Sequence, residues 1–238
     1  MAIKEGDFIQ LSYTGRIEGM VFDTTDEDMA KEAGIHNPQA LYGPAVIRVG
    51  SGHIVAGLEE AVIGKDVGEE GDVEVPPEKA FGAHDPNQVE SVPIVKFTEH
   101  PVTGMRVKID EKEGIVTSVI GRRVVVDFNS PLAGKTAIYH FSIQGVLEHP
   151  TEKVKGLIRL YVQREMEVTL TKGVLKIMLP PAIVYDRRWL LWRGRVVQEI
   201  FEYLPEVTKI QFIEVFLRPK PKEEKKQEAK TAEKTAEE

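Results

Sequence analysis

The side chains best suited to chemistry begin in the segment IQLSYTGRIEGMVFDTT, residues 9–25. The pattern is typical of a strand, a tight turn and a second strand, which together supply a phenol at Tyr13, a ring at Phe22 and a carboxylate at Asp23. Taken singly, Phe22 is an ordinary core residue, and an aspartate before two threonines suits a cap or a turn. The segment alone therefore leaves both packing and chemistry open.

Two later segments share its apolar character: GSGHIVAGLEEAVIG at 50–64 and PPEKAFG at 76–82. The chain has no cysteine, which excludes disulfides, thiol catalysis and thiolate metal sites. His53, His84 and His100 are scattered, with no His-x-x-x-His spacing, so we expect no metal site.

In this order, the motifs Tyr-x-Gly, Phe-Asp-Thr-Thr, Gly-Leu-Glu-Glu-Ala and Ala-Phe-Gly resemble the FKBP family of peptidyl-prolyl cis/trans isomerases. The resemblance covers roughly the first 150 residues, about two thirds of the chain. The segment NSPLAGK at 129–135 is similar to the Asn-x-x-Leu-Ala-Gly stretch that ends the insertion of SlyD-type FKBP chaperones. With the added C-terminal region, the chain resembles the long archaeal type of this family.

The resemblance implies a cleft in which the Val55 N–H binds the carbonyl before proline, Leu58 forms the floor and Asp23 is the single charge at the rim. It implies no cofactor and no metal. The site residues that it predicts are Tyr13, Phe22, Asp23, Ile54, Val55, Leu58, Phe81 and Tyr139. Leu58 stands where many members have tryptophan, Phe81 where tyrosine is common and Ala45 where phenylalanine is frequent, so the pocket stays apolar but offers fewer contacts to the macrolide FK506.

Such a cleft suits prolyl isomerisation. Rotation about a peptide bond crosses a barrier of about 18–20 kcal/mol because it breaks C–N resonance. The planar imide is more polar than its twisted transition state, so a dry apolar cleft favours the twisted form. No nucleophile, metal or general base is required.

The order of expected helices and strands, together with the resemblance, predicts an α+β fold. It consists of an antiparallel FKBP half-barrel sheet wrapped on a short helix, an inserted β-rich domain and a small C-terminal α+β domain. We expect strands at 2–14, 17–24, 45–49 and 71–76 and the short helix at 57–63. Further on, we expect a helix at 152–162 capped by Thr151, a hairpin turn at Lys172–Gly173, a helix from Pro180 and Pro181 to Leu204, and a strand at 208–217. The predicted boundaries are 1–85 and 127–149 for the isomerase domain, 86–126 for the insert in the flap, 150–218 for the C-terminal domain and 219–238 for a disordered charged tail.

Composition limits the partners. The chain of 238 residues has a net charge of −7, which argues against general nucleic-acid binding, and it lacks an apolar run long enough for a membrane span or an export signal. We therefore expect a cytoplasmic protein whose partners are unfolded or partly folded polypeptides with X–Pro bonds, captured by the insert.

Two rival functions stay open. One is a holdase chaperone with little isomerase activity. The other is a protein that docks to a ribosome or another partner through its C-terminal domain. One helix of this domain carries a basic and aromatic cluster: Arg187, Arg188, Trp189, Trp192, Arg193 and Arg195. The alternative for this cluster is an amphipathic helix that packs its tryptophans and leucines into the small sheet and leaves its arginines in solvent.

Overall fold

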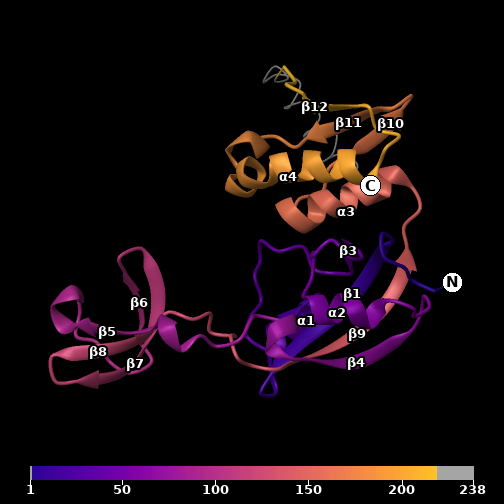
Figure 1. Ribbon diagram of the computed structural model, residues 1–238. Helices are drawn as coiled ribbons and strands as arrows, with labels where there is room; N and C mark the ends of the chain where they lie inside the picture. The colour runs from indigo at the N-terminus through magenta and orange to yellow at the C-terminus, as the bar shows by residue number, and fades with distance from the viewer. Residues whose placement is uncertain (1, 219–238) are drawn as a thin grey trace, which may run out of the picture. The chain divides into compact units, whose positions relative to one another are not determined.

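A computed structural model describes residues 2–218 of the chain (Figure 1). It divides into two units, the first ending at Arg164 and the second beginning at Glu165. The charged tail predicted at 219–238 lies outside the described residues.

The first unit is built on an antiparallel sheet with strand order β2-β1-β9-β4, in which β3 also pairs with β1. Its strands are β1 (Phe8–Ile17), β2 (Met20–Thr24), β3 (Ala45–Arg48), β4 (Glu70–Val75) and β9 (Ala137–Val146). The tight turn between β1 and β2 consists of Glu18 and Gly19, which have φ angles of 52° and 81°. Two residues with positive φ are what a twisted two-residue hairpin requires.

Two short helices belong to this sheet. Helix α1 (Glu27–Glu32) begins after Asp26, whose side chain accepts the Met29 N–H at 2.8 Å. Helix α2 (Ala56–Val62) packs on the sheet through Leu58 and Val62, which are fully buried. The predicted antiparallel sheet on a short helix is therefore confirmed.

The insert forms its own four-stranded sheet, in the order β5-β8-β7-β6. These strands are β5 (Val89–Pro93), β6 (Arg106–Ile109), β7 (Lys112–Ile120) and β8 (Arg123–Asp127). Its core is a separate cluster of buried side chains: Val92, Ile109, Val116, Val124 and Val126. Single turns of 3-10 helix, η1 (Pro77–Lys79), η2 (Pro86–Gln88) and η3 (Ile94–Lys96), lie before and within the insert.

Hydrogen bonds join the two segments that connect the insert to the first sheet. Buried Asn129 accepts the Asp85 N–H at 2.9 Å and donates to the Asp127 carboxylate at 2.7 Å. His84 Nε2 lies 2.8 Å from the other oxygen of that carboxylate, and the Gly134 N–H donates to the Gly82 carbonyl. These contacts fix where the insert leaves and rejoins the domain.

Helix α3 (Pro150–Val162) follows β9 and packs on β3 within the first unit. The sequence assigned residues 150–218 to one C-terminal domain, whereas the contacts place α3 with the sheet before it. Thr151 does not cap this helix; it begins at Pro150 after His149, because proline suits the first helical position.

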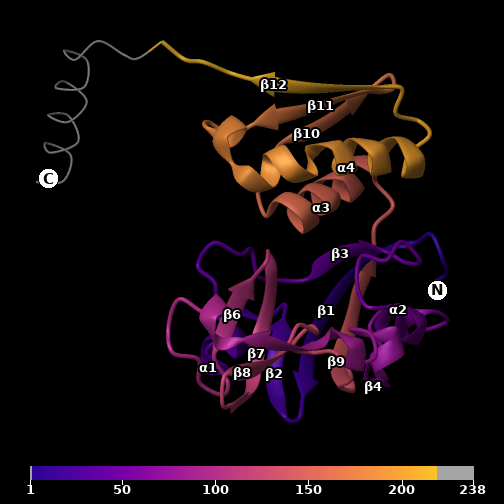
Figure 2. The same ribbon diagram turned by 60° about the vertical axis from the view of Figure 1, so that its left-hand side comes forward.

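The second unit has a three-stranded sheet with order β10-β11-β12, and α4 lies along it (Figure 2). Its elements are β10 (Val168–Thr171), β11 (Val174–Leu179), η4 (Ile183–Tyr185), α4 (Arg187–Tyr203) and β12 (Lys209–Glu214). The hairpin turn predicted at Lys172–Gly173 is present, with φ angles of 49° and 77°.

The predicted start of the long helix at Pro180 was wrong. Helix α4 begins after Asp186, whose carboxylate accepts the backbone N–H groups of Arg188 and Trp189, while Ala182 has a φ of 64° that no helix tolerates. Trp189 is buried against Phe212 with ring centroids 5.0 Å apart, so it belongs to the core of the unit and not to an exposed cluster.

None of the helices within residues 2–218 is both long and apolar enough to cross a membrane.

The contact of α3 with β3 gives the first prediction. A Cβ atom on Gly156 would lie 2.3 Å from Cγ1 of the buried Val46, so Gly156→Ala should lower the free energy of unfolding by about 1–3 kcal/mol despite the better helix propensity of alanine. A Cβ atom on Gly194 in α4 would meet no atom within 4 Å, so Gly194→Ala should raise stability by about 0.5–1 kcal/mol. Denaturant unfolding of both variants measures this difference, and an equal gain in both would contradict the packing of α3 on β3.

Candidate active site

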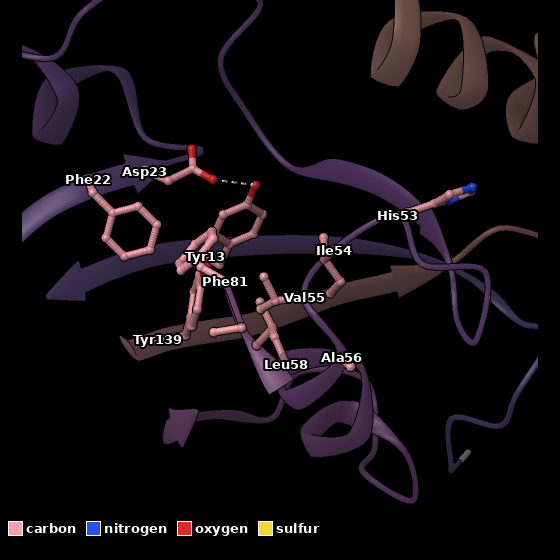
Figure 3. Close-up of a pocket in the computed structure, with 11 residues that line it drawn as sticks. Tyr13, Phe22, Asp23, His53, Ile54, Val55, Ala56, Leu58, Phe81 and Tyr139 are labelled. Carbon is pink, nitrogen blue, oxygen red and sulfur yellow. Dashed lines mark hydrogen bonds between the residues drawn. The ribbon is translucent and has the colours of Figure 1, made fainter. Parts of the chain in front are cut away.

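The structure brings all eight predicted site residues together around one cavity of about 650 Å³ (Figure 3). These residues come from β1, β2, β9, from α2 and the segment just before it, and from the segment after η1. The side chains lining the cavity are Tyr13, Phe22, Asp23, His53, Ile54, Val55, Ala56, Leu58, Ala80, Phe81 and Tyr139.

Three aromatic rings form one wall. Phe22 meets Phe81 edge to face at a centroid distance of 5.4 Å and Tyr139 at 5.8 Å. Edge-to-face contacts hold such rings in fixed orientations. Gly15 makes this arrangement possible, because a Cβ there would lie 2.7 Å from Phe22 and 2.8 Å from Tyr139.

Among the residues that the structure describes, Asp23 is the only acidic side chain that lines the cavity, and it lies at the edge, where it keeps contact with solvent. The Tyr13 hydroxyl donates to its Oδ2 at 3.2 Å (Figure 3). Burial beside the aromatic rings raises the pKa of Asp23 above its ordinary value, and the hydrogen bond from Tyr13 lowers it in part. The pKa of Tyr13 is raised by burial and by the neighbouring carboxylate, so the phenol stays protonated and acts as a donor.

The start of α2 forms the opposite side. Leu58 is fully buried beneath the cavity, and the Val55 carbonyl accepts the first N–H bonds of the helix. Within the described residues the Val55 N–H donates to no acceptor, which leaves it available to a carbonyl in the cavity.

Glu59 fixes the loop that leads to Val55. This glutamate is buried, its Oε1 accepts the Gly52 N–H at 3.2 Å, and the N–H groups of residues 50–53 surround the same carboxylate. Burial raises the pKa of Glu59, while these backbone donors lower it in part. The loop is therefore anchored one helical turn from the cavity.

Sequence reasoning missed three lining residues: His53, Ala56 and Ala80. His53 was considered only as a metal ligand, but its Nδ1 accepts the Arg48 N–H at 3.0 Å, which orients the ring. Its place directly before Ile54 and Val55 was the available signal. Ala45, by contrast, packs against the core from β3 and does not line the cavity.

The arrangement offers an apolar cavity, one carboxylate and one free backbone donor. Within residues 2–218 no group of three or more His, Cys, Asp or Glu side chains is placed to hold a metal ion. The cavity can thus desolvate and orient a peptide and bind a carbonyl.

Three family models match successive parts of the chain. They are described as FKBP-type peptidyl-prolyl cis-trans isomerase over residues 1–98, the IF domain of FKBP26 over 92–132 and the C-terminal part of FKBP26 over 150–217.

Curated relatives resemble the same region. The chain is 36% identical over 147 residues to a short-type peptidyl-prolyl cis-trans isomerase of Methanocaldococcus jannaschii, a match that covers 60% of this chain and 94% of that protein. It is 37% identical over 152 residues to the FKBP-type isomerase SlyD of Haemophilus influenzae, covering 61% of this chain and 72% of that one. Both matches pair it with isomerases over most of their length.

The electrostatics of the cavity gives a prediction for Asp23. Because the Tyr13 hydroxyl stabilises the charged form, Tyr13→Phe should raise the pKa of Asp23 further above its ordinary value of 3.8. NMR titration of the Asp23 carboxyl carbon measures it. In a control variant, Tyr185→Phe, the lost hydroxyl belongs to a side chain of the second unit that is 85% exposed, so the titration should not change. A lower pKa in Tyr13→Phe would show that the hydrogen bond does not hold the carboxylate.

Proposed function

The chain belongs to the FKBP-type peptidyl-prolyl cis-trans isomerases, and we propose that it isomerises X–Pro bonds in the cavity lined by Phe22, Asp23 and Tyr139. It is an isomerase that acts on polypeptides containing proline. The observation that carries the assignment of the cavity is its composition: aromatic and aliphatic walls with a single carboxylate at the edge.

Catalysis in this cavity is differential solvation. The planar imide loses solvation free energy when the aromatic wall covers it. The twisted state is less polar and loses less solvation free energy, so enclosure lowers the barrier of about 18–20 kcal/mol. Each ~1.4 kcal/mol gained only by the twisted state speeds the reaction tenfold. The rings of Phe22, Phe81 and Tyr139, fixed edge to face, provide this enclosure.

Polar groups orient the substrate. The Val55 N–H binds the carbonyl that precedes the proline, and the proline ring rests on Leu58. Asp23, held by Tyr13, places a negative charge beside the amide without exchanging a proton with it. The carboxylate therefore acts through its field and its hydrogen bond.

The insert captures clients. Its sheet has an independent core and leaves Val95, Val102 and Ile120 exposed at 86%, 58% and 67% of their surface. Exposed apolar side chains on a small domain suit weak contacts with unfolded chains. Weak capture raises the local concentration of X–Pro bonds near the cavity, as two linked binding sites do.

Contact of the C-terminal unit with ribosomes stays a prediction from the sequence, as does the cytoplasmic location. The holdase alternative differs from the proposal in one property, the activity on short peptides.

Substitution of Phe22 tests the cavity. Phe22→Ala removes the ring that contacts both Phe81 and Tyr139, so kcat/KM on a proline tetrapeptide should fall about tenfold or more. Met20 lies on the same strand and is 68% exposed, so Met20→Ala should leave the rate unchanged. Undiminished turnover by a folded Phe22→Ala protein would show that the reaction occurs elsewhere.

Removal of the insert separates the two activities. If residues 86–126 are replaced by a short Gly/Ser loop, isomerisation of the tetrapeptide should persist, because every residue lining the cavity lies outside this range. Proline-limited refolding of a whole protein should slow about tenfold or more relative to the full-length enzyme, since capture is lost. The ratio of the two rates is measured for both proteins, and equal losses would mean that the insert only supports the fold.

A further inference from the structure

Helix α3 contacts the segment that leads to Val55 and the loop that precedes β3, although it lies after the closing strand β9 and within the region that matches the C-terminal part of FKBP26. It is seated on β3 by Gly156, where the backbone of the helix approaches Val46 too closely for a side chain. From this position the C-terminal turn of α3 reaches two loops, one that follows β3 and one that precedes β3.

On one side, α3 reaches the segment before α2. The rings of Tyr161 and His53 meet edge to face, with centroids 5.9 Å apart and an interplanar angle of 87°. His53 is also held by the Arg48 N–H, and in Figure 3 its side chain points away from the aromatic wall, whereas Ile54 and Val55, which follow it, face the cavity. The contact with Tyr161 thus holds His53, which lies two residues before the Val55 N–H.

On the other side, α3 holds the loop before β3. The Gln163 Oε1 accepts the Leu41 N–H at 2.9 Å, and the Arg159 guanidinium donates to the Tyr42 carbonyl. Gln163 has a left-handed backbone with a φ of 56°, which turns its side chain back so that Nε2 also donates to the Arg159 carbonyl.

This loop continues to the Asp23 side of the cavity. The Gly43 N–H donates to the Thr25 carbonyl at 2.8 Å. Thr25 in turn exchanges hydrogen bonds with the backbone of Tyr13, donating its N–H at 2.9 Å and accepting the Tyr13 N–H on Oγ1 at 3.0 Å. A continuous set of contacts therefore joins α3 to the residue that donates to Asp23.

We propose that α3 is a positioning element of the isomerase, in which Tyr161 holds the His53–Val55 segment and Gln163 holds the loop that leads to Thr25. The inference rests on the proposed cavity. The helix touches no substrate; it restricts the loops that carry the carbonyl-binding N–H and the Tyr13–Asp23 pair. Because orientation counts most where the substrate becomes twisted, loss of this restraint lowers kcat more than it raises KM.

The test compares three substitutions in the full-length chain. Tyr161→Leu keeps apolar volume and removes the ring, Tyr161→Phe keeps the ring, and Lys155→Ala changes an exposed residue of the same helix. For Tyr161→Leu we expect kcat/KM on the tetrapeptide to fall about three- to tenfold, mainly through kcat, with shifted amide NMR signals at residues 52–55. The other two variants should match the parent.

Each other outcome overturns the inference. A parent-like rate in folded Tyr161→Leu would show that the ring does not position the segment, and an equal loss in Tyr161→Phe would assign the effect to the hydroxyl. If Tyr161→Leu does not fold, Gln163→Ala applies the same test at residues 41–43, where unchanged amide signals and rate would exclude the restraint. Phe22→Ala serves as the reference. If Phe22→Ala is also fully active, the proposed cavity itself is wrong. If Phe22→Ala loses activity while Tyr161→Leu stays active, only the role of α3 is refuted.

Discussion

The site depends on the register of strand β1, which pairs with β2, β3 and β9 at once. In this register Gly15 lies opposite Asp23 on one neighbour and Tyr139 on the other. The missing side chain of Gly15 leaves the space that the Phe22 and Tyr139 rings fill. A slip by one residue would turn every side chain of β1 to the other face, so the pairing that forms the core also forms the cavity.

Much of this was predictable because it is local or depends on ordered motifs. The strand–turn–strand unit ending in Phe22 and Asp23 follows from alternation and from Gly19, and all eight predicted side chains line one cavity. Two helix starts were misplaced: prolines at 180 and 181 suggested a start that the carboxylate of Asp186 determines, and Thr151 was chosen as a cap although Pro150 is already helical. Local propensity does not reveal which of two nearby caps tertiary contacts select.

The contacts of His53 and α3 could not be predicted because they join segments that are distant in the sequence. The position of the His53 ring depends on the Arg48 N–H and on Tyr161, which lies more than a hundred residues later. The sequence grouped α3 with the elements that follow it, whereas Gly156 seats it on β3. The core of the insert, by contrast, could be recognised from composition, because the valine side chains of its neighbouring strands pack against one another.

We infer that the cavity lowers the barrier by enclosing and orienting the imide, with no proton transferred. The most direct measurement is kcat/KM on the tetrapeptide between about pH 6 and pH 8, in both H₂O and D₂O. We expect a flat profile and a solvent isotope effect of about 1, because Asp23 acts as a fixed charge and Tyr13 stays protonated. A sigmoidal profile with an isotope effect of about 2 or more would contradict it, since a proton would then move in the rate-limiting step.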